Sequence, residues 1–465
     1  MSDQLGASTF PHRQRRVVIE AVTPQVDGGR FSVKRIVGDR VTIEADVFAD
    51  GHDDIAARLL WRLGSDEWHA QEMEAVGNDR WRAALALPQI GRYEYVIEGR
   101  VDHLLTWIRD LGRRSEAGTV TTVDLQIGSA LVSDLASRAA DASDATRLRA
   151  VADQLVDAAT PGSDHATIGR DPSVATLARR YPDLRNAAMS PPLTIVVDRE
   201  RARFSSWYEA FPRSMSLDED RHGTFRDVIA ALPTVAAMGF DVLYLPPIHP
   251  IGRSFRKGPN NALEAGAGDP GVPWAIGSTD GGHDAIHPEL GTIDDFRDLV
   301  SAARVNGLEI ALDIAFQASP DHPWVEQHPT WFKHRPDGSI QYAENPPKRY
   351  QDIYPFDFES ADWQGLWQAL LDVMRHWAAE GVRVFRADNP HTKAFPFWEW
   401  AIAALTAEYP DVILLAEAFT RPKVMYRLAK VGFSQSYTYF TWKTTKSELT
   451  EYFTELMTTD VRETF

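Results

Sequence analysis

The stretch "GVRVFRADNPHTK", residues 381–393, decides the fold of the second half of this 465-residue chain. Apolar residues precede Arg386 and Asp388, and Asn389 and Pro390 follow them at once. Residues i and i+2 lie on the same side of a strand, so a strand ending here carries an arginine and an aspartate on one face. Such a pair is tolerable where the end of the strand opens into a cleft. The stretch therefore predicts a strand whose end contributes to a binding or catalytic site.

Similar apolar segments recur through residues 193–465, and helical patterns separate them. Strands are predicted within residues 203–211, 241–248, 308–316, 382–389, 411–419 and 433–440. Nearly all-apolar strands that alternate with helices are typical of a parallel sheet covered on both faces. Both an open doubly wound sheet and a (β/α)8 barrel fit this order. The first strand lacks a following Gly-x-Gly-x-x-Gly, which weighs against a dinucleotide-binding sheet.

The chemistry at the strand ends favours the barrel, with about six of its eight strands and an insertion at about residues 319–360. Three parts precede it. Residues 1–14 are expected to be a disordered tail. Short alternating segments within residues 15–125 predict an immunoglobulin-like β-sandwich. Residues 126–192 show helical spacing and predict a small helical module. The aromatic residues of the β-sandwich are interpreted as packing residues rather than a sugar-stacking platform: Trp61, Trp68, Trp81, Tyr93 and Tyr95.

The composition argues against several classes of partner. The formal net charge of -17 argues against a nucleic acid held by counterion release and against an anionic membrane surface. The chain has no cysteine, so disulfides and thiol chemistry are excluded and a reducing compartment is favoured. The sequence contains neither a signal-peptide core nor an apolar run of about 18 residues. These features predict a cytoplasmic protein with no nucleic-acid or membrane partner.

Carboxylates occur in three successive predicted strands, as Asp313, Asp388 and Glu417. Catalytic residues of a barrel stand at the carboxyl ends of its strands. Two carboxylates roughly 5–5.5 Å apart suit retaining glycosyl transfer, and strands about 4.8 Å apart can deliver that spacing. Arg386 would stabilise the ionised form of Asp388, as a nucleophile requires. Desolvation by the preceding apolar run could raise the pKa of Glu417, as a general acid requires.

The blocks "FRADNPH", "LLAEAF" and "ALDIAFQ" resemble those of the α-amylase superfamily (glycoside hydrolase family 13), which uses a retaining mechanism on a (β/α)8 barrel. The longer blocks "YLPPIHPIG", "GGHDAIHPELGTIDDF" and "RPDGSIQYAENPPKRYQDIYP" resemble the bacterial α-1,4-glucan:maltose-1-phosphate maltosyltransferases over nearly the whole chain. The resemblance implies transfer of maltosyl units from α-maltose 1-phosphate to the non-reducing end of α-1,4-glucans, with release of phosphate. It also implies a homodimer, and the chemistry needs no cofactor.

The resemblance further implies residue roles. Asp388 matches the nucleophile and Glu417 the general acid/base, with Arg386 beside them. The positions that match donor-binding residues are Lys257, Gln317, Asp352 and Asn389. The positions that match a phosphate-receiving loop are Asn345, Lys348 and Tyr350, whose amide, ammonium and phenol groups all donate hydrogen bonds to phosphate. No metal site is expected, and the histidines at turns are interpreted as sugar-binding or structural groups: His249, His283, His287, His322 and His391.

Departures from the superfamily pattern leave alternatives open. Gln317 and Ala318 stand where an ordinary amylase has Asn-His, and Thr392 stands where it has His or Lys, which counts against a plain hydrolase. No block after Phe440 resembles the one that carries the third carboxylate of the superfamily. The chain is therefore expected to be C-terminally truncated and to be inactive or nearly so. The alternative functions are an α-amylase-like hydrolase and an inactive glucan-binding fragment.

Overall fold

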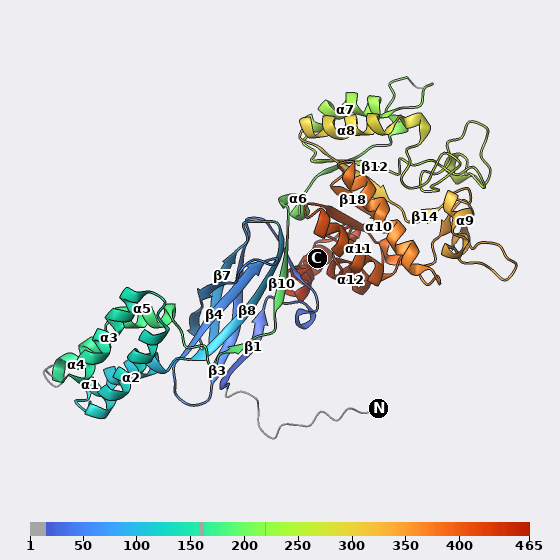
Figure 1. Ribbon diagram of the computed structural model, residues 1–465. Helices are drawn as coiled ribbons and strands as arrows, with labels where there is room; N and C mark the ends of the chain where they lie inside the picture. Colours follow the sequence, from blue (N-terminus) through green and yellow to red (C-terminus); the bar gives the residue numbers. More distant parts are fainter. Residues whose placement is uncertain (1–14, 158–161, 219) are drawn as a thin grey trace. The chain divides into compact units, whose positions relative to one another are not determined.

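The computed structural model describes residues 15–157, 162–218 and 220–465, which divide into two compact units (Figure 1). Val196–Phe465 form the second unit together with 34–37 and 89–91, and the other described residues form the first. Sheets and helices occur in both units, which confirms the prediction of a multidomain protein built from both. The tail predicted for the N-terminus lies outside the described residues. No described helix is both long enough and apolar enough to cross a membrane.

The described residues before 199 contain two β-sheets. The first has the strand order β1 (Val17–Thr23), β3 (Arg40–Ala49), β7 (Arg80–Ala86) and β6 (Glu74–Gly77). The second has the order β2 (Val33–Ile36), β10 (Leu193–Asp198), β8 (Gly91–Val101), β4 (Ile55–Leu63) and β5 (His69–Glu72), with β9 (Ala188–Met189) paired to β8. The pairs β1–β3, β3–β7 and β4–β8 are antiparallel. The domain boundary predicted at residue 193 is wrong, because it would remove β10 from this second sheet.

The two sheets meet across an apolar core. Buried and more exposed residues alternate along β3, which is the pattern of a strand with one face turned toward a core. A Cβ on Gly99 of β8 would lie 2.8 Å from side-chain atoms of both Val17 and Val47 of the other sheet. The sheets therefore approach each other closely at this glycine. Tyr93 and Tyr95 of β8 are buried, in agreement with the packing role predicted for them, whereas Trp68, with the same prediction, is 43% exposed.

A group of helices follows β8: α1 (His103–Glu116), α2 (Thr122–Arg138), α3 (Ala142–Val156), α4 (Gly162–Gly169) and α5 (Pro172–Arg180). The prediction that the β domain extends to residue 125 is wrong, because helix already begins at His103. The carboxylate of Asp102 accepts a hydrogen bond from the Leu105 N–H and so caps α1. Trp107 and Leu111 of α1 are buried in the core of this helical group. Burial of these side chains at helical spacing explains why the segment is a helix.

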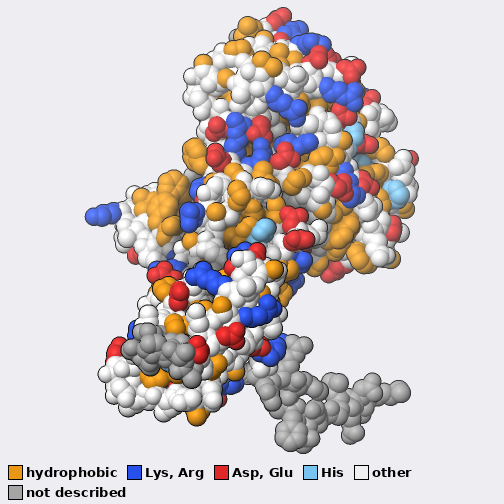
Figure 2. Space-filling view, turned by 60° about the vertical axis from the view of Figure 1, so that its left-hand side comes forward, with side chains coloured by type: hydrophobic (Ala, Val, Ile, Leu, Met, Phe, Trp, Pro, Cys, Tyr) orange, Lys and Arg blue, Asp and Glu red, His pale blue; other side chains and the backbone are white. Residues whose placement is uncertain are grey.

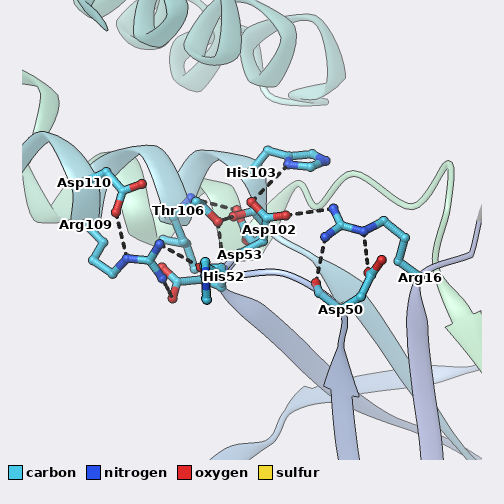
Figure 3. Close-up of polar contacts among 11 residues, drawn as sticks. Arg16, Asp50, His52, Asp53, Asp102, His103, Thr106, Arg109 and Asp110 are labelled. Carbon is cyan, nitrogen blue, oxygen red and sulfur yellow. Dashed lines mark hydrogen bonds and ion pairs between the residues drawn. The ribbon is translucent and has the colours of Figure 1, made fainter.

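Hydrogen bonds join the start of α1 to the loop between β3 and β4 (Figure 3). Arg109 donates to the Asp54 carboxylate at 2.6 Å and to the His52 carbonyl at 2.9 Å. The Asp54 N–H donates to the Thr106 hydroxyl at 2.8 Å, and that hydroxyl donates to the Asp102 carbonyl at 2.8 Å. The start of the helical group is thus attached to the loop that connects β3 with β4.

Gly128 of α2 lies against the indole of Trp107, where a Cβ would come within 1.9 Å of a ring carbon. In a helix interior, alanine is normally more favourable than glycine by about 1 kcal/mol. Here overpacking dominates, and Gly128→Ala is expected to lower the free energy of unfolding by ~1–3 kcal/mol. Urea unfolding measures this free energy. The control is Ser129→Ala at the adjacent half-buried position, which should change the free energy of unfolding by less than ~0.5 kcal/mol. An unchanged or more stable Gly128→Ala protein would contradict the contact.

The second unit contains a six-stranded sheet whose order follows the chain: β11 (Trp207–Glu209), β12 (Val242–Leu245), β13 (Glu309–Ile314), β18 (Val384–Asp388), β19 (Ile413–Glu417) and β20 (Gln435–Ser436). Every neighbouring pair is parallel. Each strand lies within a segment that the sequence predicts as a strand. All residues of β12 and β18 are buried, as expected for strands covered on both faces.

Helices connect or follow these strands: α6 (Glu200–Arg203), α7 (Phe225–Ala237), α8 (Ile293–Val305), α10 (Trp363–Ala379), α11 (Phe395–Glu408), α12 (Pro422–Lys430) and α13 (Lys446–Thr458). Helical crossovers allow consecutive strands to run parallel. Capping boxes at Thr224 and Thr292 start α7 and α8, which run side by side in Figure 1. The rings of Phe225 and Phe296 join these two helices with centroids 5.5 Å apart.

Short elements occupy the region of the predicted insertion: β14 (Gln317–Ala318), α9 (Pro323–Gln327), β15 (Ala343–Asn345), β16 (Lys348–Tyr350) and β17 (Tyr354–Pro355). β14 pairs antiparallel with β17, which holds the two ends of the segment together. β15 and β16 form a separate antiparallel hairpin. The insertion is therefore ordered by its own strand pairs rather than by the main sheet.

Acidic and basic side chains are interspersed on the face of the protein that Figure 2 displays. Ion pairs join different helical segments of the second unit: Arg297 of α8 pairs with Glu380, which directly follows α10, at 2.6 Å, and Arg375 of α10 pairs with Glu408 of α11. Mixed charge of this kind is typical of a solvated protein surface.

Candidate active site

Parallel pairing of β18 and β19 places Asp388 directly opposite Glu417, each at the last position of its strand. Adjacent strands lie about 4.8 Å apart, so the two carboxylates stand side by side at one end of the sheet. Asp388 is buried and Glu417 is half-buried. The structure therefore brings together the two carboxylates that the sequence singles out.

Arg386 links the carboxylates of three neighbouring strands. Its Nη1 donates to Asp313 Oδ2 at 2.8 Å and to Asp388 Oδ1 at 2.9 Å, and its Nη2 lies 3.5 Å from Glu417 Oε2. The guanidinium also lies over the rings of Tyr244 and Tyr437, at 5.8 Å and 5.9 Å from their centroids. Buried charges need partners of this kind, so the arginine and the carboxylates compensate one another.

The two carboxyls beside Asp388 are shifted toward their protonated forms. Burial raises the pKa of Asp313 to about 7, although Arg386 opposes the shift. The Tyr244 hydroxyl donates to Asp313 Oδ2 at 2.5 Å. Burial also raises the pKa of Glu417, against the effects of Arg386 and of a hydrogen bond from the Asn389 N–H. A raised pKa is the direction of shift that a general acid working near neutral pH requires.

The residues predicted to bind the donor fall into separate groups. Asn389 belongs with the carboxylates, because its N–H donates to Glu417 Oε2 at 3.1 Å and its Nδ2 to Asp388 Oδ2 at 3.3 Å. Lys257 and Asp352 are both buried, and burial raises the pKa of Asp352 while the Lys257 ammonium opposes that shift. Gln317 is half-buried, and its Nε2 donates to the Trp274 carbonyl at 3.2 Å.

The residues predicted to receive phosphate lie on the β15–β16 hairpin. Asn345 pairs directly with Lys348, and Tyr350 is two residues further along β16. Paired residues, and residues two apart on one strand, lie on the same face of a hairpin. Asn345 and Lys348 are exposed and Tyr350 is half-buried. One face of the hairpin therefore presents an amide, an ammonium and a phenol.

The histidines near β13 form a buried hydrogen-bonded group. His283 Nδ1 lies 3.0 Å from His322 Nε2, and His283 Nε2 lies 3.0 Å from the Ala315 carbonyl. His249 Nδ1 lies 3.0 Å from the Ala285 carbonyl. Burial lowers the pKa of His249 to about 3, of His283 to about 4 and of His322 to about 2. These rings are buried and their nitrogens are paired with groups of the protein itself, which fits the structural interpretation.

Among the described residues, a group with metal-ligand chemistry is His222, His287 and Glu289, whose ligand atoms lie within 4.8 Å of one another. Burial lowers the pKa of His287 to about 4, and the charges of Arg213 and Arg256 lower it further. Guanidinium groups that disfavour a protonated imidazole also disfavour a metal cation.

Tyr244, Tyr437 and Lys393 belong to the site, but the sequence reasoning did not find them. Tyr244 lies in β12, where a buried hydroxyl signals the need for a hydrogen-bond partner. Lys393 is 9% exposed, and its ammonium donates to the Asp388 carbonyl at 3.3 Å. A lysine beside the apolar segment "AFPFW" is a weak signal of a buried cation.

A family model and two sequence relatives agree with the resemblance found in the sequence. A family model described as "Alpha-1,4-glucan:maltose-1-phosphate maltosyltransferase, domain N/S" matches residues 15–199. A protein of that enzyme name from Chlorobaculum tepidum is 53% identical over 97% of this chain and 67% of its own length. Another from Rhodospirillum rubrum is 50% identical over 96% of this chain and 67% of its own length. Among solved structures, an α-amylase from Lactobacillus plantarum has a TM-score of 0.40 and 30% identity, covering 54% of this chain and 52% of that chain.

The chain thus spans about two thirds of the length of these two relatives. At least half of the aligned residues are identical over nearly the whole of this chain. The chain therefore belongs to the α-1,4-glucan:maltose-1-phosphate maltosyltransferase family.

Proposed function

We propose that the protein transfers maltosyl units from α-maltose 1-phosphate to the non-reducing end of α-1,4-glucans, with retention of configuration and release of phosphate. Family membership supports the substrates and the reaction. The observation that carries the chemistry is the register of Asp388 with Glu417 on adjacent parallel strands, with Arg386 contacting both. The reaction belongs to α-glucan biosynthesis.

The proposed mechanism has two displacement steps. Asp388 attacks the anomeric carbon, the bond from that carbon to the phosphate oxygen breaks, and phosphate leaves with assistance from the Glu417 proton. The product is a β-maltosyl ester of Asp388. Glu417 then takes the proton of the acceptor 4-hydroxyl, whose oxygen attacks the same carbon and releases the Asp388 carboxylate. Two inversions give net retention.

We further propose that the six parallel strands are six of the eight strands of a (β/α)8 barrel. Support comes from their parallel pairing, their sequential order and the position of the carboxylates at strand ends. The two sheets before residue 199 are proposed to be an immunoglobulin-like β-sandwich, with the helical group as a separate module. The protein is proposed to be a cytoplasmic homodimer.

Phosphate release tests the function. The protein is incubated with α-maltose 1-phosphate and a maltooligosaccharide, and both free phosphate and chain length are followed. The proposed function predicts phosphate release with products that lengthen by two glucose units, whereas the expectation of a truncated, inactive chain predicts neither. Reducing sugar released from starch, with no consumption of the phosphorylated donor, would instead favour an α-amylase-like hydrolase. Glucan binding without either reaction would favour a glucan-binding fragment.

Lys348→Met tests the phosphate-receiving hairpin. The exposed Lys348 ammonium lies on the same hairpin face as Asn345 and Tyr350. Losing one charged hydrogen bond to phosphate is expected to weaken donor use roughly 10-fold or more, seen as a higher KM for α-maltose 1-phosphate. Lys333→Met, which removes another exposed lysine of the insertion, is the control. An unchanged KM for the donor in Lys348→Met would exclude this role.

A further inference from the structure

Asn389 adopts a left-handed backbone conformation, with φ 43° and ψ 52°. Such a conformation is uncommon outside glycine, although asparagine tolerates it better than most residues. The residue contacts both members of the carboxylate pair, through its N–H to Glu417 and its side-chain amide to Asp388. The conformation of this one turn therefore determines a hydrogen bond to Glu417.

The ammonium of Lys393 binds the same turn through its backbone carbonyls. Lys393 Nζ donates to the Asp388 carbonyl at 3.3 Å, to the Asn389 carbonyl at 3.2 Å and to Thr392 Oγ1 at 3.0 Å. An ammonium has three hydrogens to donate, and here each has an acceptor. Thr392 Oγ1 also donates to the Asn389 carbonyl at 2.8 Å, so the turn is held by two side chains.

Burying a lysine without a counter-charge is costly. The carboxylates of Asp388, Glu417 and Asp313 favour the charged form of Lys393, whereas burial and Arg386 oppose it. The Lys393 ammonium therefore interacts with these carboxylates through its charge, while its hydrogen bonds go to the turn. Lys393 and Arg386 act on the same carboxylates, but only Lys393 contacts the backbone of the Asn389 turn.

We propose that Lys393 is a positioning residue, whose ammonium fixes the left-handed Asn389 turn so that the Asn389 N–H hydrogen-bonds to Glu417. The inference deepens the proposed function and relies on it for the role of Glu417 as the acid/base. A hydrogen bond and a cation both favour the ionised form of a carboxyl. The titratable and charged groups that face Glu417 are Arg386, Asp388, Lys393 and Tyr437.

The kinetic test compares Lys393→Met with Lys446→Met, which removes an exposed ammonium at the start of α13. Lys393→Met is expected to lower kcat about 10- to 100-fold, because small displacements of a catalytic group cost that much. The KM for the donor is expected to change far less. The basic limb of the pH profile of kcat should move to higher pH, because Glu417 keeps its proton longer. A lower kcat with an unmoved basic limb would reduce Lys393 to a structural role.

A second test needs no sugar substrate. The loss of unfolding free energy caused by Lys393→Met is measured from acidic to mildly basic pH, in the wild-type and Glu417→Gln backgrounds. Lys393 favours the ionised form of Glu417, so the loss should grow as pH rises through the pKa of Glu417. Part of that growth should disappear in the Glu417→Gln background, where only the other carboxylates titrate.

Identical pH dependence in the two backgrounds would overturn the inference, whatever donor the enzyme uses. This measurement does not depend on the proposed function, because it uses no substrate. A failure of the positioning role would likewise leave the proposed function untouched. Lys393→Gln, which keeps hydrogen-bond donors without the charge, is the variant to use if Lys393→Met does not fold. The loss of unfolding free energy in Lys393→Gln should also grow with pH, and by less in the Glu417→Gln background.

Discussion

Replacing Asp388 with asparagine is expected to lower kcat on the order of 10⁴- to 10⁶-fold, as the loss of a catalytic nucleophile does in other enzymes. Asp388 ends β18, with Oδ1 bound by Arg386 at 2.9 Å and Oδ2 by Asn389 at 3.3 Å. A neutral amide of the same size cannot form the glycosyl ester on which retention depends. Phosphate release from α-maltose 1-phosphate, together with urea unfolding, measures the change.

The chain offers a matched control for this substitution. Asp411 precedes β19 and pairs with Arg383, which precedes β18, at 3.1 Å. This Arg–Asp pair therefore stands at the ends of β18 and β19 opposite to those that carry Asp388 and Glu417. Asp411→Asn is expected to retain nearly the wild-type kcat. An Asp388→Asn protein that keeps more than about 1% of wild-type kcat would exclude Asp388 as the nucleophile.

Local signals in the sequence suffice for the strands of the second unit and for part of the site. Apolar runs that end in polar residues are local patterns, so β18 and β19 and their terminal carboxylates could be predicted. The contact of Tyr244 with Asp313 could not, because it joins residues 69 positions apart. In an apolar strand, a tyrosine looks like another core residue. The burial of Lys393 could not be predicted either, because a lysine is usually exposed and only the folded turn brings carbonyl groups to its ammonium.

The boundaries of the parts were less predictable. β8 ends at Val101 and α1 begins at His103, so Asp102 alone separates strand from helix. A boundary without a loop leaves no glycine or proline signal to read. β10 was misassigned for a different reason. It joins β2 and β8 through pairing over long sequence separations, and its alternation alone does not tell to which sheet it belongs.

Replacing Arg386 with methionine is expected to have the largest effect on stability. The change leaves Asp313, Asp388 and Glu417 around an apolar side chain, with the first two buried. Removing one partner of a buried ion pair costs roughly 3–5 kcal/mol, and the free energy of unfolding at pH 8 should fall by about that amount. Arg383→Met is the control, because its pair with Asp411 is part-exposed and such pairs contribute ~0–1 kcal/mol.

The effect of Arg386→Met should depend on pH in a defined direction. Burial raises the pKa of Asp313 from its ordinary 3.8 to about 7, so the wild-type protein loses stability as pH rises through that interval. Arg386 opposes this shift for Asp313 and also for Glu417, and its removal should raise both pKa values further. The loss of stability in the variant should then continue above pH 7. Urea unfolding should show a small difference in the free energy of unfolding between variant and wild type near pH 4, and the largest difference in basic solution. A difference that stays constant with pH would mean that Arg386 does not compensate these carboxylates.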